Sequence, residues 1–145
     1  MSITIDYTDF SDYTKRKDKR ENFPHKKLTY QIISAAMEVH KELGPGFLEK
    51  VYENALIVEL LEVRRIPTEV QKSIPLLFYK GKRIGEHILD ILVAGNVILE
   101  IKAVKELAPV HEAQLLSYLK ATNCKVGLLL NFADKSLKYK RLIKD

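Results

Sequence analysis

The stretch from Ile88 to Ala103 most constrains how this chain can fold, because it places charges inside two apolar runs. Its sequence is ILDILVAGNVILEIKA, and its charged residues are Asp90, Glu100 and Lys102. The second run, VILEIK, is apolar on both sides of the glutamate, which is typical of a strand covered on both faces. An ionised carboxylate there is costly unless it is paired or binds a metal ion. The stretch therefore predicts a charged site on a buried β-hairpin.

The length of the hairpin loop decides whether the two carboxylates meet. A three-residue loop over residues 94–96 would place Asp90 opposite Glu100, whereas a two-residue loop would place Asp90 opposite Ile101. The loop sequence is AGN, and its glycine and asparagine both tolerate a positive φ, which three-residue hairpin loops usually need. We therefore predict the three-residue loop.

Two interpretations of these charges remain open at this point. Glu100 and Lys102 are two residues apart, so on a strand they point to the same face, where Asp90 can join them as a functional site. Alternatively, Glu100 and Lys102 form a structural ion pair, and Asp90 is an unrelated charge at a strand end.

Composition indicates one globular domain. The chain has 145 residues, of which 46% are hydrophobic and 30% are charged. No apolar run approaches the ~20 residues of a membrane span, and the N-terminus lacks the pattern of a secretory signal, so we expect no membrane association. Cys124 is the only cysteine, which excludes an internal disulfide and favours a cytoplasmic location. The net charge of +5 fits an anionic partner such as nucleic acid.

The first 27 residues are polar and contain the basic run KRKDKR, from Lys15 to Arg20. They predict a flexible N-terminal arm, which is either a solvated tail or a phosphate-binding segment, ahead of a domain over residues 28–145.

Hydrophobic periodicity predicts the elements of that domain. The expected segments are helices over about 28–43, 47–64 and 109–121 and strands over 70–79, 83–93, 97–104 and 126–132. This order, α-α-β-β-β-α-β, predicts an α/β sandwich around a mixed four-stranded sheet, with the strand at 126–132 parallel to that at 97–104. Residues 137–143 fit an edge strand or a short helix.

The strand over 70–79 has its own pattern. Its alternation predicts that Ile74, Leu76 and Phe78 point inward, and Pro75 favours an edge position in the sheet.

Several helical side chains are further candidates. Glu49 and Glu53 lie one turn apart at the start of the second helix, and Gln114 and Tyr118 share a face of the third. Each has an ordinary alternative as surface charge or as a surface glutamine beside a half-buried tyrosine. His40 lies at a helix end, where a histidine is more often structural than a ligand.

The chain resembles the PD-(D/E)xK nuclease superfamily, with its restriction-endonuclease-like fold, through the acid at Asp90 and the sequence Glu100-Ile101-Lys102. Within it, the segment Gly46-Phe47-Leu48-Glu49-Lys50-Val51-Tyr52 is similar to the signature of the GxxExxY family. Further similar positions, over residues 28–143, are His40, Leu43-Gly44-Pro45-Gly46, Gly81-Lys82, Gly85, Pro109-Val110-His111-Glu112-Ala113-Gln114 and Val126-Gly127-Leu128-Leu129-Leu130-Asn131-Phe132. Leu89 replaces the proline of the motif, at a position that varies widely.

The resemblance implies a metal-dependent nuclease acting on nucleic acid, with DNA as the expected substrate. Mg²⁺ or Mn²⁺ would be held by Asp90, Glu100 and the carbonyl of Ile101, with Glu49 completing or supporting the site. Lys102 would orient the attacking water or stabilise charge on the phosphate.

Other residues have roles that the resemblance implies less directly. Gln114 and Tyr118 match the Gln-x-x-x-Tyr motif of some exonuclease branches and would position the phosphate or brace the metal ligands. His40 and His111 are weaker candidates for phosphate contact.

Two other functions compete with the nuclease. The protein could be a nucleic-acid-binding or regulatory module that retains the fold and turns over little. It could also be a homodimeric scaffold, because the apolar circumference of the second helix could pack against a partner helix.

Overall fold

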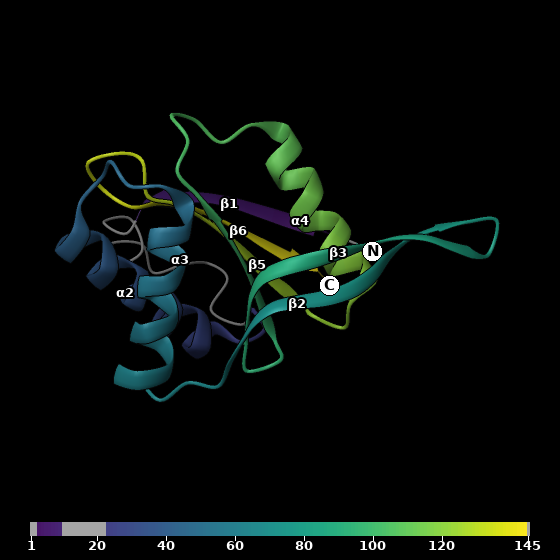
Figure 1. Cartoon of the computed structure of the whole chain (residues 1–145), viewed down its shortest axis with the longest axis horizontal. Coiled ribbons are helices and arrows are strands. Elements are labelled where there is room, and N and C mark those ends of the chain that lie inside the picture. Colours follow the sequence, from purple (N-terminus) through teal and green to yellow (C-terminus); the bar gives the residue numbers. More distant parts are fainter. Residues whose placement is uncertain (1–2, 10–22, 145) are drawn as a thin grey trace.

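The computed structural model describes residues 3–9 and 23–144, with the side chains of 3–9 and of Leu76 and Leu77 outside the description. The elements are β1 (Ile3–Asp9), α2 (Lys26–Leu43), α3 (Glu49–Val58), the π-helical turn η1 (Glu59–Val63), β2 (Thr68–Tyr79), β3 (Lys82–Val93), β4 (Val97–Lys102), α4 (Pro109–Ala121), β5 (Val126–Asn131) and β6 (Lys138–Lys144). They build one mixed sheet in the order β1-β6-β5-β4-β3-β2, flanked by helices (Figure 1).

The sheet separates two hydrophobic cores. Helices α2 and α3 cover one face, where Ile33 and Leu56 pack with Leu99 and Ile101 of β4. Helix α4 covers the other face, and there its residue Leu115 packs with Ile98 of β4 among other buried side chains. Because β4 is covered on both sides, Val97 to Ile101 are all buried, as the unbroken apolar run predicted.

The predicted hairpin register is confirmed. Val93 pairs with Val97 and Ile91 with Leu99, so the loop comprises residues 94–96. The sequence suggested that Gly95 and Asn96 would have positive φ. In the structure Ala94 and Gly95 have it instead, at 51° and 69°, so the left-handed positions lie one residue earlier in the loop. Continuing the same register places Asp90 opposite Glu100.

The seven predicted elements occur in the predicted sequence, but strand β1 precedes them and strand β6 follows them, and the predicted four-stranded sheet is wrong, because six strands pair. Residues 138–144 form strand β6 rather than a helix, and β6 is not an edge because β1 pairs with it antiparallel. Strand β1 lies within the segment predicted as an N-terminal arm. The basic run from Lys15 to Arg20 lies outside the described residues, so the arm prediction stays a prediction for that run.

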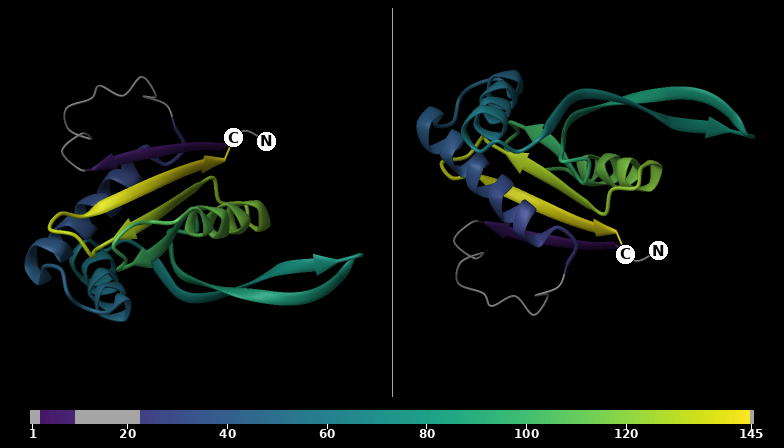
Figure 2. Two further views of the ribbon diagram at one scale, coloured as in Figure 1. Left: turned by 90° about the horizontal axis from the view of Figure 1, so that it is seen from above. Right: turned by 90° about the horizontal axis from the view of Figure 1, so that it is seen from below.

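Four predictions about individual elements have different outcomes. Strands β4 and β5 are parallel, and β2 is an edge strand that carries Pro75, both as predicted. The second helix does not continue regularly to Arg64, because its last turn, η1, is π-helical. Ile74 is buried, but Phe78 is 59% exposed, because β2 and β3 continue as a two-stranded ribbon beyond the part of the sheet that the helices cover (Figure 2). The side chain of Leu76 lies outside the description.

Among the described residues, no helix has an apolar stretch of the length that would cross a membrane.

Helix α4 and strand β5 are in tight contact at Gly127, and this contact gives a prediction for stability. A Cβ atom added there would lie 2.7 Å from Cδ1 and 2.9 Å from Cγ of the buried Leu115. We expect Gly127→Ala to lower the free energy of unfolding by about 1–3 kcal/mol, measured by urea denaturation, because the core must shift to accept the methyl group. In a Leu115→Ala background the same change should cost much less, and equal penalties in both backgrounds would contradict this account.

Candidate active site

The alternation along β4 assigns its charged side chains to one face of the sheet. Ile98 packs in the core under α4, whereas Leu99 and Ile101 pack in the core under α2 and α3. Glu100 and Lys102 follow Ile98 at two-residue steps, so they lie on the α4 face. Glu100 is only 5% exposed, while Lys102 at the end of the strand is half-buried.

Asp90 lies where the backbone ladder between β3 and β4 ends. The last residue pair of that ladder is Ile91 with Leu99. One residue further, Oδ2 of Asp90 accepts the backbone N–H of Ile101 at 3.1 Å, so a side chain replaces the missing ladder bond. Strand β2 is irregular at the same level, because its residue Gln71 has φ of 52°. Asp90 therefore sits at an opening between strands and faces the segment that carries Glu100.

The two carboxyl groups interact strongly. The pKa of Glu100 is raised from 4.5 to about 9, first by burial, then by the negative charge of Asp90 and by a side-chain hydrogen bond with Asp90, while the Lys102 ammonium opposes the rise. Among the described residues, Oε1 of Glu100 has no hydrogen-bond partner. A buried carboxyl beside a second one must either hold a proton or neutralise its charge with a cation.

The geometry of this corner fits a hard metal cation. Asp90 and Glu100 supply carboxylate oxygens, which Mg²⁺ and similar ions prefer. The carbonyl of Lys102 accepts the N–H of Phe132 at the β5 side, so the carbonyl of Ile101, which alternates with it, points toward the opening beside β3. These three residues could hold an ion with oxygen ligands alone, and the unpartnered oxygen of Glu100 is the observation that supports the fit.

Glu49 reaches the end of β4 from the opposite face of the sheet. Its Oε1 accepts the backbone N–H of Ala103 at 3.3 Å. In the described part of the chain, no three or more His, Cys, Asp or Glu side chains gather closely enough to hold a metal ion together. The contact of Glu49 is therefore with the backbone next to Lys102, while Asp90 and Glu100 form a pair by themselves.

The predicted signature residues around Glu49 hold the start of α3 in place. Gly46 has φ of 109°, a conformation that favours glycine, in the turn between α2 and α3. The hydroxyl of Tyr52 donates to the carbonyl of Gly44 at 2.6 Å and accepts the N–H of Phe47 at 3.2 Å. These bonds tie the turn to the helix, so that Glu49 projects toward Ala103. Glu49, Glu53 and Ala103, with Phe47, Leu48 and Lys50, line an open pocket of about 460 Å³.

Asn131 is a positioning residue that the sequence analysis missed. It is buried at the end of β5, and its amide both accepts the N–H of Val104 at 3.1 Å and donates to the carbonyl of Val104 at 2.8 Å. With the bonds from Asp90 and Glu49, it holds the backbone on both sides of Lys102. A polar residue at the end of a buried strand was the available signal.

Tyr118 and His87 form the wall of the site below α4. Tyr118 is buried, and its pKa is raised by burial first and then by the charges of Glu100 and Asp90. Its hydroxyl is hydrogen-bonded to Nε2 of His87, and the two rings stack with centroids 4.2 Å apart. Burial lowers the pKa of His87, while Asp90 raises it and Lys102 lowers it, so this histidine belongs to the same charge cluster.

His87 was not expected at the site. It lies three residues before Asp90 on β3, and regular alternation would place the two on opposite faces. Leu89 and Leu92, also three residues apart, nevertheless pack in the same core, so the alternation of β3 slips at the level of Asp90. No sequence signal in this strand predicted that slip.

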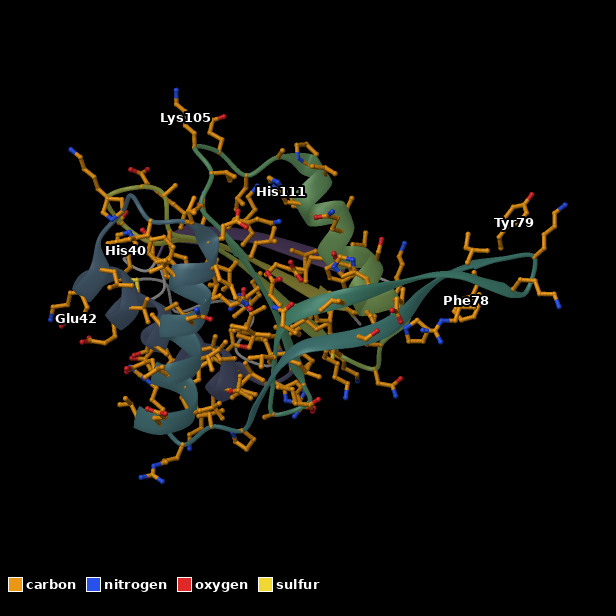
Figure 3. The ribbon with its side chains drawn as sticks, viewed as in Figure 1. His40, Glu42, Phe78, Tyr79, Lys105 and His111 are labelled. Atoms are coloured by element: carbon orange, nitrogen blue, oxygen red, sulfur yellow. The ribbon has the colours of Figure 1, made fainter. Side chains whose placement is uncertain are left out.

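The remaining predicted candidates lie outside the cluster of Asp90, Glu100 and Lys102. The ring of His40 stacks on that of Phe132, and its Nε2 is hydrogen-bonded to the carbonyl of Asp134 at 2.8 Å. Nδ1 of His111 accepts the N–H of Ala108 at 3.0 Å. Both histidines, labelled in Figure 3, therefore have structural hydrogen bonds. Glu53 is buried and accepts bonds from Gln71 and Lys50. Gln114 lies one turn before Tyr118 on α4, with its side chain exposed.

The raised pKa of Glu100 predicts how stability depends on pH. Between its ordinary pKa of 4.5 and its folded value of about 9, the unfolded chain releases a proton that the folded protein retains. The free energy of unfolding should therefore fall as the pH rises through this window. We expect metal-free wild type to lose more stability than Glu100→Gln between about pH 5.5 and about pH 8.5 in urea denaturation. Parallel pH profiles for the two proteins would refute this.

Comparison with known proteins assigns the chain to a family. The family model described as the PD-(D/E)XK nuclease superfamily matches residues 26–142, which include the whole site. Neither the curated proteins nor the solved structures provide a significant match. Nucleases of this superfamily generally use divalent metal ions. Because the match spans most of the chain, the protein belongs to the PD-(D/E)XK nuclease superfamily.

Proposed function

We propose that the protein is a metal-dependent nuclease that hydrolyses phosphodiester bonds of DNA at the Asp90–Glu100–Lys102 site. The observation that carries the proposal is the pair of interacting carboxyls on neighbouring strands, one of them buried with an unpartnered oxygen. A structural Glu100–Lys102 pair accounts for that less well, because it leaves Asp90 beside Glu100 with their repulsion uncompensated. Membership of a nuclease superfamily supports the same conclusion.

Each residue of the site has a role in this proposal. Asp90, Glu100 and the carbonyl of Ile101 hold Mg²⁺ or Mn²⁺, and the bond from Glu49 to Ala103 keeps the strand end in place from the other face. When bound, the ion supplies positive charge to the phosphate and lowers the pKa of a nearby water. The ammonium of Lys102 orients that water or stabilises the charge that develops on the phosphate.

The wall under α4 has a supporting role. Tyr118 is fixed by its contacts with His87 and carries a hydroxyl next to the carboxyl pair, where it braces the metal ligands. We propose that Gln114, which is exposed one turn earlier on the same helix, contacts the phosphate backbone. We also place the chain in the GxxExxY branch of the superfamily, because Gly46, Glu49 and Tyr52 each have a defined contact or conformation at the start of α3.

Metal binding tests the carboxylate site without a substrate. In calorimetric titrations with Mn²⁺ and Mg²⁺, we expect the wild type to bind and Asp90→Asn to lose binding, because only Glu100 remains as a charged ligand. At neutral pH, binding should release about one proton, since Glu100 must ionise to coordinate the ion. The matched control is Asp134→Asn, an exposed aspartate in the loop before β6. Equal binding by wild type and Asp90→Asn would exclude this pair as the metal site.

Lys102 separates a nuclease from a module that only binds nucleic acid. We expect Lys102→Met to lower the rate of DNA cleavage at least about 100-fold, while duplex binding measured by fluorescence anisotropy changes little, because the lysine acts on the reacting phosphate. Lys125→Met, an exposed lysine before β5 at the other end of the sheet, should cleave like the wild type. Metal-dependent duplex binding without cleavage by the wild type would favour the binding module.

A further inference from the structure

Strands β2 and β3 extend well beyond the rest of the sheet as a two-stranded ribbon. In three views the ribbon leaves the helical layers and ends in a free tip, far from α2 (Figures 1 and 2). Its two strands stay paired up to Tyr79 and Lys82, with register irregularities between Ile74 and Phe78. No other described element covers the tip, where Phe78, Tyr79 and Ile84 are 59%, 60% and 62% exposed.

The tip combines exposed apolar side chains with positive charge. Residues 78–84 read FYKGKRI, with three cations and no acid. Nζ of Lys80 lies 5.4 Å from the ring centroid of Tyr79, while Arg83 is paired with Glu86 at 2.9 Å. Side chains of Phe78 and Tyr79 project from the end of the ribbon (Figure 3). Exposed aromatic and basic residues together are unusual on a solvated turn and are typical of surfaces that bind nucleic acid.

The ribbon projects from the same end of the sheet as the candidate active site. Strand β3 is antiparallel to β4, so the residues before Asp90 continue past the end of β4 that carries Lys102. From Asp90 back to Lys82, strand β3 spans about 26 Å at ~3.3 Å per residue, which matches about eight base pairs of B-form DNA. A duplex bound at the carboxylates can therefore also contact the tip.

We propose that the β2–β3 ribbon is a DNA-binding arm that lies in a groove of duplex DNA about eight base pairs from the cleaved bond. This inference rests on the proposed nuclease function and adds a second contact surface to it. Lys80 and Lys82 contact phosphates, and Phe78 and Ile84 press against bases or sugars. A two-stranded ribbon fits the major groove of B-form DNA, and exposed apolar side chains on such arms can also wedge between base steps. The narrow major groove of A-form RNA does not admit a ribbon.

The two kinds of contact give different signatures in a binding experiment. The probe is a fluorescein-labelled 30-base-pair DNA duplex, and binding is measured by anisotropy in Ca²⁺ at several salt concentrations. Lys80→Gln/Lys82→Gln should weaken binding about tenfold to 100-fold and reduce the magnitude of the log–log salt slope by about 2, because two phosphate contacts are lost. Phe78→Ala/Ile84→Ala should weaken binding about tenfold with an unchanged slope, because no charge is removed.

A matched control and a shorter duplex make the test specific to the ribbon. Lys27→Gln/Lys125→Gln removes two exposed lysines from the start of α2 and the loop before β5, and should bind like the wild type. On a hairpin duplex of about five base pairs, too short to span from the carboxylates to the tip, the tip variants should differ from the wild type by less than about threefold.

Several outcomes would overturn the inference. In the first, the tip variants bind the 30-base-pair duplex with the affinity and the salt slope of the wild type. In the second, they lose binding only to single-stranded DNA. In the third, they bind the duplex normally, but sedimentation shows a monomer where the wild type is a dimer. The last result would assign the tip to a second copy of the chain. If the wild type cleaves DNA and the tip variants bind normally, only this inference fails. If binding depends on the tip but no metal supports cleavage, only the proposed nuclease function fails.

Discussion

The repulsion between two carboxyl groups at the opening between β3 and β4 is the interaction on which the site depends. Burial and the neighbouring Asp90 raise the pKa of Glu100 to about 9, so the pair is stable only with a proton or a cation between its charges. The opening exists because the β3–β4 ladder ends at Ile91 and Leu99, and Asp90 bonds the N–H of Ile101 in place of a backbone carbonyl. The Asp90 carboxylate thus both bonds the backbone of β4 and lies next to Glu100.

The backbone at the end of β4 is hydrogen-bonded by side chains from three directions. Asp90 bonds it from β3, Glu49 from α3 on the other face, and Asn131 from β5. These bonds satisfy the backbone N–H groups of residues 101, 103 and 104 around Lys102. A buried backbone group without a partner is costly, so the same side chains that prepare the site also stabilise the strand end.

The slip in β3 at Asp90 connects the site with the projecting ribbon. On one side of the slip β3 pairs with both β2 and β4, and on the other side it pairs with β2 alone, first under α4 and then as the projecting ribbon (Figure 2). The slip also brings His87 against Tyr118 and into the charge cluster. Because the ribbon continues directly from the segment that carries Asp90, its tip lies at a set distance from the carboxyl pair.

The sequence by itself determined the order of the elements from α2 to β5, the register of the hairpin and the meeting of Asp90 with Glu100. These follow from local signals, namely periodicity, loop length and charges inside apolar runs, which act over a few residues. The tertiary structure alone decided the remaining features. Pairing of β1 with β6 and the exposure of Phe78 depend on which strands the helices cover. The place of His87 depends on an irregularity that breaks alternation, and the bonds of Glu49 and Asn131 join residues 54 and 27 positions apart in the chain. Contacts over such separations are set by packing of the whole fold, which no local pattern encodes.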